Sequence, residues 1–190
     1  MEWFTVEPNR VDRFGWSSFL YACSRGRIDI VKKFLERSDT DVNRPSPINE
    51  TPLFWACHEG HDGIVKLLLK DKRVNINEAD IRGRTPFFIA CGNGHLEVVK
   101  LLLKDSRVDL NKETSFGSTP FLVACYFGRL EIIQHLLISE RKINFNVVDE
   151  DGTAIENARR FKGVVELLES FESNPKETRA KIKRHFTVDG

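Results

Sequence analysis

The chain has 190 residues, of which 41% are apolar and 30% are charged, a composition typical of folded globular proteins and not of disordered or fibrous ones. Its 29 basic and 28 acidic residues leave a formal charge of +1, so no overall positive field favours nucleic acid or an anionic membrane as a partner. The first residues lack the basic and apolar stretches of a signal peptide, and the longest apolar run, residues 121–127, is too short to span a membrane.

Residues 1–11 come first and contain an apolar stretch, Trp3, Phe4 and Val6, that ends at Pro8. A regular pattern begins directly after them, near residue 12. We therefore expect residues 1–11 to be an N-terminal extension that caps the first unit of this pattern.

The pattern is a 34-residue repeat, marked by evenly spaced cysteines at positions 23, 57, 91 and 125. A fixed period of this length predicts a repeat array. In three of the four copies the segment that leads to the cysteine opens with a Thr-Pro pair, as at Thr85 and Pro86. Threonine is a favoured N-cap and proline is favoured at the first helical position, so a helix is predicted to begin there.

A second helix is predicted in each repeat. A turn glycine stands three residues after each cysteine, and apolar pairs such as those at 98–99 and 102–103 then recur with the spacing of one buried helical stripe. Shortly before each first helix stands a residue that tolerates positive φ in a tight turn: Gly15, Asn49, Gly83 or Gly117. Each repeat is therefore predicted to contain a hairpin-like loop and two antiparallel helices.

The segment 83–103, which contains the Thr-Pro pair, the Ala-Cys pair and a Leu triplet, resembles the ankyrin repeat. The resemblance extends over roughly residues 12–170 and implies an all-α ankyrin-repeat solenoid with repeats starting near residues 12, 46, 80, 114 and 149. Segments such as Asp41-Val42-Asn43 match the family's entry into the finger loop. By the same resemblance, Asn77 and Asn111 stand where asparagines of the family can be hydroxylated.

The repeat also departs from the family, because its 34-residue period is one longer than the family's usual period. The additional residue lies in segments 70–73 and 104–107, after the second helix, where we expect it to lengthen a connector without touching the core. His61 and His95 follow the turn glycines as in the family, and each is expected to make a local hydrogen bond at the start of the second helix.

A fifth copy is predicted to open at Thr153. Its Thr153 and Glu156 have the spacing of a capping box, which compensates for the missing proline. The turn that follows is shorter than in the other copies, as expected for a terminal repeat with nothing stacked beyond it.

Residues 171–190 are predicted to form a C-terminal capping helix and tail. The chain restarts at Asn174 with an N-cap residue followed by proline. We expect the last helix to be short. Its apolar side, with Ile182 and Phe186, is expected to pack on the array, while its basic residues face solvent.

Metal and thiol chemistry are disfavoured by the spacing of the candidate ligands. No two cysteines are closer than one repeat length, and the chain has no Cys-x-x-Cys or His-x-x-x-His pair. Cysteines in adjacent repeats lie too far apart for a disulfide, which favours reduced thiols in the cytoplasm or nucleus. We therefore predict no catalytic residue, no metal and no cofactor.

The candidate binding residues follow from the resemblance to ankyrin arrays, whose concave side is formed by finger-loop tips and the exposed ends of the inner helices. The matching positions vary among the repeats while the framework positions barely change, and aromatic and arginine residues dominate interface hot spots. The predicted partner-binding residues are Arg13, Phe14, Trp16, Arg25, His58, Glu59, Ile81, Arg82, Arg84, Asn93, Phe116, Tyr126 and Phe127.

Three hypotheses for function remain open at this point. The first is a non-enzymatic module, monomeric on its own, that binds another protein and acts by occupancy as an adaptor, scaffold or inhibitor. The second is a structural component that self-associates through its ends or convex face. The third is an anion or nucleic-acid binder that uses the basic C-terminal tail, which predicts a steep salt dependence.

Overall fold

The computed structural model describes residues 7–188, and the predicted capping stretch at Trp3, Phe4 and Val6 lies outside these residues. Helices joined by turns and loops account for the described part of the chain, which has no strand beyond two isolated bridges. The predicted all-α class is therefore confirmed. The helices are α1 (Ser18–Ser24), α2 (Ile28–Leu35), α3 (Pro52–His58), α4 (Asp62–Lys70), α5 (Pro86–Asn93), α6 (Leu96–Lys104), α7 (Pro120–Tyr126), α8 (Leu130–Ile138), α9 (Ala154–Ala158), α10 (Lys162–Ser173) and α11 (Pro175–Val188).

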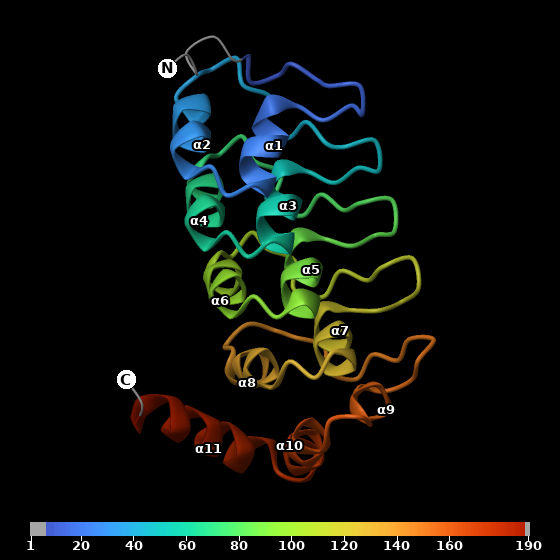
Figure 1. Cartoon of the computed structure of the whole chain (residues 1–190). Helices are drawn as coiled ribbons and strands as arrows, with labels where there is room; N and C mark the ends of the chain where they lie inside the picture. Colours follow the sequence, from blue (N-terminus) through green and yellow to red (C-terminus); the bar gives the residue numbers. More distant parts are fainter. Residues whose placement is uncertain (1–6, 189–190) are drawn as a thin grey trace.

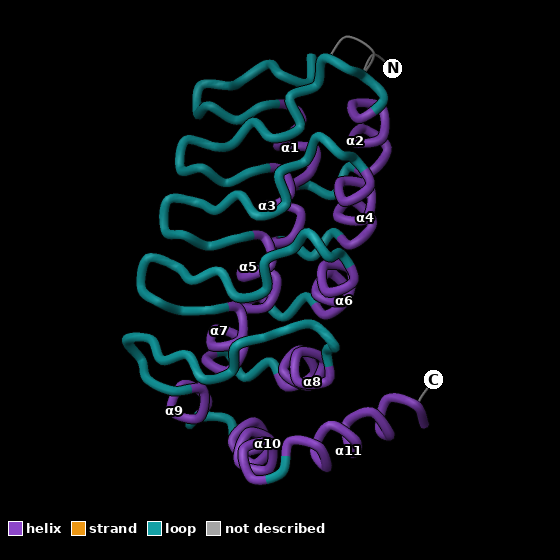
Figure 2. The backbone as a smooth tube through the Cα atoms, turned by 180° about the vertical axis from the view of Figure 1, so that it is seen from behind, coloured by secondary structure: helices purple, strands orange, loops and turns teal. Residues whose placement is uncertain are grey.

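The helices form stacked antiparallel pairs. The inner helices α1, α3, α5, α7 and α9 contact one another in that order, and the outer helices α2, α4, α6 and α8 form a second column. Long loops project from the inner column on the side away from the outer helices (Figure 1). The view from behind shows the same row of loops extending along the whole stack (Figure 2).

The first helix of each repeat begins where its sequence predicts. The Thr85 hydroxyl accepts a hydrogen bond from the backbone N–H of Phe88 (3.1 Å), and Pro86 occupies the first turn. Ser17 takes the same role in the first repeat by accepting from Leu20 N (3.0 Å). In the fifth, Thr153 and Glu156 form the predicted capping box. Each cap satisfies backbone donors that the helix itself cannot pair.

Two turn positions show why particular residue types are needed. Asn49 has φ +62°, the only positive φ outside glycine among the described residues, as its place in a tight turn predicts. Gly60, with φ +73°, packs so closely under the His95 ring that a Cβ atom there would lie 2.4 Å from Nδ1. A side chain at Gly60 would therefore separate the second and third repeats.

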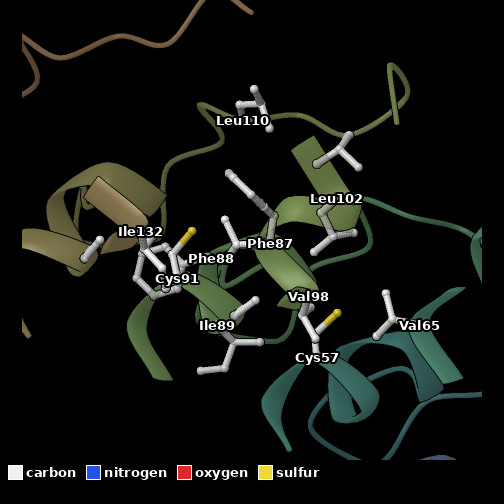
Figure 3. Packing of buried hydrophobic residues seen from close by; sticks show 14 of the residues in the cluster. Cys57, Val65, Phe87, Phe88, Ile89, Cys91, Val98, Leu102, Leu110 and Ile132 are labelled. Atoms are coloured by element: carbon white, nitrogen blue, oxygen red, sulfur yellow. The ribbon is translucent and has the colours of Figure 1, made fainter. Parts of the chain in front are cut away.

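The core is a continuous cluster of apolar side chains between the helix layers. Figure 3 shows the part of this cluster around Phe87 and Cys91. Cys57 and Cys91 are fully buried between neighbouring inner helices, where small side chains let the helices approach closely. Larger residues such as Phe87 and Leu102 fill the space around them. All four cysteines are unpaired and buried, as predicted.

Asparagines spaced one repeat length apart join each repeat to the next. The Asn77 amide donates to the carbonyl of Arg107 (2.7 Å) and accepts from the N–H of Asp109 (2.8 Å). Asn9, Asn43 and Asn111 make the same pair of bonds in their own repeats. One side-chain amide thus forms hydrogen bonds with two backbone groups that have no partner within their own loop.

The connectors with the additional residue also join each repeat to the preceding one, which the sequence analysis did not predict. Arg73 pairs with Asp71 and donates to the backbone carbonyls of Leu35 and Arg37 in the preceding repeat (both 3.1 Å). Arg107 and Arg141 repeat the contact along the stack. These arginines pair carbonyls near the C-terminal ends of the preceding outer helices, which those helices cannot satisfy internally.

The prediction that His61 and His95 make local hydrogen bonds is wrong. The Nε2 atom of His61 donates to the carbonyl of Ser24 (3.1 Å), and that of His95 donates to the carbonyl of His58 (2.8 Å). A carbonyl oxygen can only accept, so Nε2 carries the proton in both rings. Both bonds cross to the preceding repeat, because the second helix starts beneath the end of the previous inner helix.

The C-terminal end differs from the expected short helix. α11 has 14 residues, more than any other helix that the structure describes. It packs on α8 and α10, with Ile182 buried and the Phe186 ring stacked on His135 at 4.5 Å between centroids. Its apolar side therefore packs on the array as predicted. The proposed limits of the extension, the array and the tail stay predictions.

Candidate protein-binding surface

A polar side chain at the base of each finger loop shapes its tip. In the third repeat Asp80 Oδ1 accepts from the backbone N–H groups of Arg82 and Arg84 (both 2.9 Å). Asp12 and Thr114 make equivalent pairs of bonds in the first and fourth repeats. Such side-chain turns fix the loop and leave the next two residues at its tip. The sequence analysis missed these residues, although an Asp, Ser or Thr stands three residues before the positive-φ residue of each finger loop.

The tips of the second, third and fourth repeats are joined by backbone hydrogen bonds. Ile81 N donates to the carbonyl of Ile48 (3.2 Å), and Ser115 N donates to the carbonyl of Arg82 (3.0 Å). The fingers therefore form a supported row, in which each tip residue has a fixed place.

Five of the predicted binding residues are large apolar side chains that remain strongly exposed. The exposed fractions are 59% for Phe14, 65% for Ile81, 56% for Phe116, 43% for Tyr126 and 47% for Phe127. Tyr126 and Phe127 stand edge to face, with ring centroids 5.0 Å apart. Exposed apolar side chains that gather in one patch, as Tyr126 and Phe127 do, are typical of interaction sites.

Three of the predicted residues have structural contacts instead. Trp16 is half-buried between the Tyr21 and Trp55 rings, each at 5.0 Å between centroids. The Asn93 amide donates to the carbonyl of His58 (2.9 Å). Arg84 pairs with Asp80, to which its Nε donates (2.7 Å), and lies 3.7 Å from Glu50. Packing between repeats accounts for these three side chains.

The remaining charged and polar residues lie on the exposed part of the surface. His58 Nδ1 is 2.8 Å from a Glu59 carboxylate oxygen, and the His58 ring lies beside the Trp55 ring. The Arg13 guanidinium covers one face of Phe14 at 4.7 Å from the ring centroid. Arg25 and Arg82 are exposed, and within residues 7–188 neither guanidinium has an ion pair.

Of the exposed aromatic residues, Phe116, Tyr126 and Phe127 border a groove of about 440 Å³ between the third, fourth and fifth repeats. Val123 and Phe88, both largely buried, contribute to its apolar lining, and the fifth finger contributes an acidic edge that the sequence analysis did not select. The lining residues are Arg82, Arg84, Phe88, Thr114, Phe116, Ser118, Val123, Tyr126, Phe127, Asp149, Glu150, Asp151 and Asn157.

Comparison with known families agrees with this geometry. The model of the family described as ankyrin repeats (3 copies) matches residues 1–80 and 72–151. The chain belongs to the ankyrin repeat family. No curated protein sequence matches it. Ankyrin repeats are in general protein–protein interaction modules, and the family is typically non-enzymatic.

The side chains of this ankyrin array that could carry other chemistry are few. Across the described residues, no group of His, Cys, Asp and Glu could hold a metal ion. Burial raises the pKa of the Cys125 thiol to about 12, so its reactive thiolate is scarce at neutral pH. No helix in the described part of the ankyrin chain is long and apolar enough to cross a membrane.

Proposed function

We propose that this ankyrin chain binds another protein on its concave surface, formed by the finger tips and the exposed ends of the inner helices, and acts by occupancy. The observation that carries the proposal is the group Phe116, Tyr126 and Phe127, which stays 43–56% exposed beside a groove. Aromatic side chains bury a large area on binding at a low entropic cost, so they suit an interface. The role is that of an adaptor, scaffold or inhibitor.

The concave surface is favoured over the basic tail by the contacts of α11. Arg179 donates to the carbonyl of Leu137 (2.8 Å), and its guanidinium lies 5.2 Å from the Phe171 ring centroid. Lys181 pairs with Glu177 (2.9 Å). These cations therefore serve the attachment and stability of the helix itself. The four buried thiols favour a reducing compartment, the cytoplasm or nucleus.

The proposal is tested by quantitative affinity capture from lysate with the wild type and a variant in which Phe116, Tyr126 and Phe127 are changed to Ser. We expect the amount of a specific captured protein to be at least about tenfold lower with the variant than with the wild type, because hot-spot residues dominate binding energy. The control is Leu130→Ser, an exposed apolar residue on the outer helix α8. Circular dichroism verifies that both variants fold.

Equal capture by wild type and concave variant would contradict the proposal. An equal loss of capture in Leu130→Ser would show that non-specific apolar binding, and not the concave surface, retains the protein. Size-exclusion mass at several concentrations tests the alternative of self-association, for which the proposal expects a monomer throughout.

A further inference from the structure

The groove carries opposite charges at its two ends. Arg82, at the tip of the third finger, lines one end, while Glu150 and Asp151, at the tip of the fifth finger, line the other. Phe116, at the tip of the fourth finger, stands between them in chain order. The tips of the array thus change from basic to acidic along the direction of stacking.

These charges are not used to hold the fold together. The Asp149 carboxylate is occupied, since it accepts from Asn157 Nδ2 and from the N–H of Asp151 (both 3.1 Å). In the described part of the chain, the carboxylates of Glu150 and Asp151 make no ion pair, and neither does the Arg82 guanidinium. Arg84 also lines the groove, but Asp80 and Glu50 neutralise its charge.

The lining between the two ends is mostly apolar, although it also includes Thr114 and Ser118. Phe116 and Phe127 are about half exposed, and Val123 lies buried among the lining residues. The Arg129 guanidinium lies 5.8 Å from the Phe127 ring centroid and donates to the carbonyl of Gly92 on the inner helix α5. A ligand therefore meets a charged end, an apolar middle and an end of opposite charge.

We infer, on the basis of the proposed function, that this groove binds an extended segment of the partner protein with an acidic side chain at Arg82, an apolar one against Phe116 and Phe127, and a Lys or Arg at Glu150 and Asp151. Charge complementarity at both ends fixes which charged side chain of the segment lies at the third finger and which lies at the fifth. A nucleic-acid strand does not fit, because the acidic end repels its phosphates.

The spacing of the repeats sets the length of the segment. Packed helices lie about 8–10 Å apart, so two repeat steps from the third finger to the fifth span about 16–20 Å. An extended chain advances about 3.3 Å per residue. The acidic and basic side chains of the segment are therefore separated by about five or six residues.

The test begins with selection of a random dodecapeptide display library on the full-length protein in low-salt buffer. Enriched peptides are synthesised with a fluorescent label, and their binding is measured by anisotropy. Three variants are compared with the wild type. The aromatic variant carries Phe116→Ser, Tyr126→Ser and Phe127→Ser. The charge variant carries Glu150→Lys and Asp151→Lys, and the control carries Glu169→Lys and Glu172→Lys. The control makes the same change of net charge at two exposed residues of α10.

The expected consensus is an acidic residue, an apolar residue and a basic residue in that order or its reverse. The charge variant is expected to weaken binding about tenfold or more, and the control to leave it unchanged. A peptide with the basic residue replaced by an acidic one is expected to bind the charge variant better than it binds the wild type.

The outcomes separate this inference from the proposed function. Binding that is lost in the aromatic variant but kept in the charge variant overturns the assignment of a basic side chain while supporting the concave surface. Binding that survives in both variants contradicts the proposed function as well. Failure to enrich any peptide overturns the assignment to an extended segment.

Discussion

At the scale of single residues, an asparagine that recurs at the same position of successive repeats explains how each loop is attached to the next repeat. Asn43, Asn77 and Asn111 each use both ends of the side-chain amide on backbone groups of the next repeat. The periodic sequence places these asparagines at equivalent positions. It does not reveal their partners, which lie almost a full repeat further along the chain and are fixed only by stacking.

Replacement of Asn77 by Ala tests this role. It leaves the N–H of Asp109 and the carbonyl of Arg107 without their partner, so we expect the free energy of unfolding to fall by about 1–3 kcal/mol. The control is Asn146→Ala, because Asn146 is exposed in the fifth loop and only its backbone N–H is hydrogen-bonded. Urea unfolding measures both variants, and equal stability of the two would refute the role.

Exposure at the candidate surface was predictable for some residues and not for others. Phe116 and Phe127 are exposed as the repeat register predicts, because framework positions of each repeat are already filled by other residues. Trp16 occupies an equivalent tip region but packs on Trp55 of the second repeat. That outcome depends on which residue the neighbouring repeat carries, so one repeat's sequence alone does not determine it.

At the scale of secondary-structure elements, the inner and outer helices follow from caps, turn glycines and apolar spacing, whereas α11 does not. The sequence indicates its N-cap, since Asn174 Oδ1 accepts from the N–H of Glu177 (3.2 Å). Its length and its contact with α8 have no counterpart in the other repeats, and the turn before α10 is also shorter, since Phe161 follows Arg129 by two positions fewer than Arg129 follows His95. The main contact of this C-terminal part with α8 is made by α11 and not by α10.

His135 links this contact to pH. The corresponding position holds Leu in the second and third repeats, and here the imidazole stacks on Phe186 of α11. Burial lowers the pKa of His135 below its ordinary value of 6.5, with a further contribution from the nearby Lys100 charge. As pH falls through about 6.5 the undocked form takes up a proton first, so acid weakens the attachment of α11.

We therefore expect α11 to exchange its amide hydrogens faster at pH 5.5 than at pH 7.5, after correction for the intrinsic pH dependence of exchange. His135→Leu restores the residue of the neighbouring repeats and is expected to abolish this difference. Hydrogen exchange read by mass spectrometry resolves α11 from α5, which serves as the internal reference. A difference that persists in His135→Leu would assign the effect to another group.

At the scale of the whole molecule, the stack is one-dimensional, because the main contacts of each repeat are with its neighbours along the column. The order of the helices and the position of the fingers could be predicted from the period together with the helix caps, turn residues and apolar spacing of the repeats. The acidic end of the groove could not, because the fifth finger has one residue fewer between its turn glycine and its helix. Its tip residues therefore stand one position nearer to the start of the inner helix than those of the other copies.

One-dimensional stacking predicts different effects of core truncation at the centre and at the end. Leu102→Ala in α6 and Leu168→Ala in α10 both remove a buried side chain, at a cost of about 2–5 kcal/mol. We expect Leu102→Ala to lower the urea midpoint of the whole array. Leu168→Ala is expected to release α9, α10 and α11 first, in a separate transition seen by hydrogen exchange. Uniform protection loss in both variants would argue against independent ends.

The most direct test of the concave binding surface is site-specific photo-crosslinking in cells that produce the protein. A photoreactive amino acid is placed at Phe116 or Phe127 on the concave surface and, as the matched control, at Lys32 or Lys66 on the exposed side of the outer helices. The proposed function predicts that the two concave positions capture the same protein and the two outer positions do not. Capture of a common protein from the outer helices alone would contradict the claim.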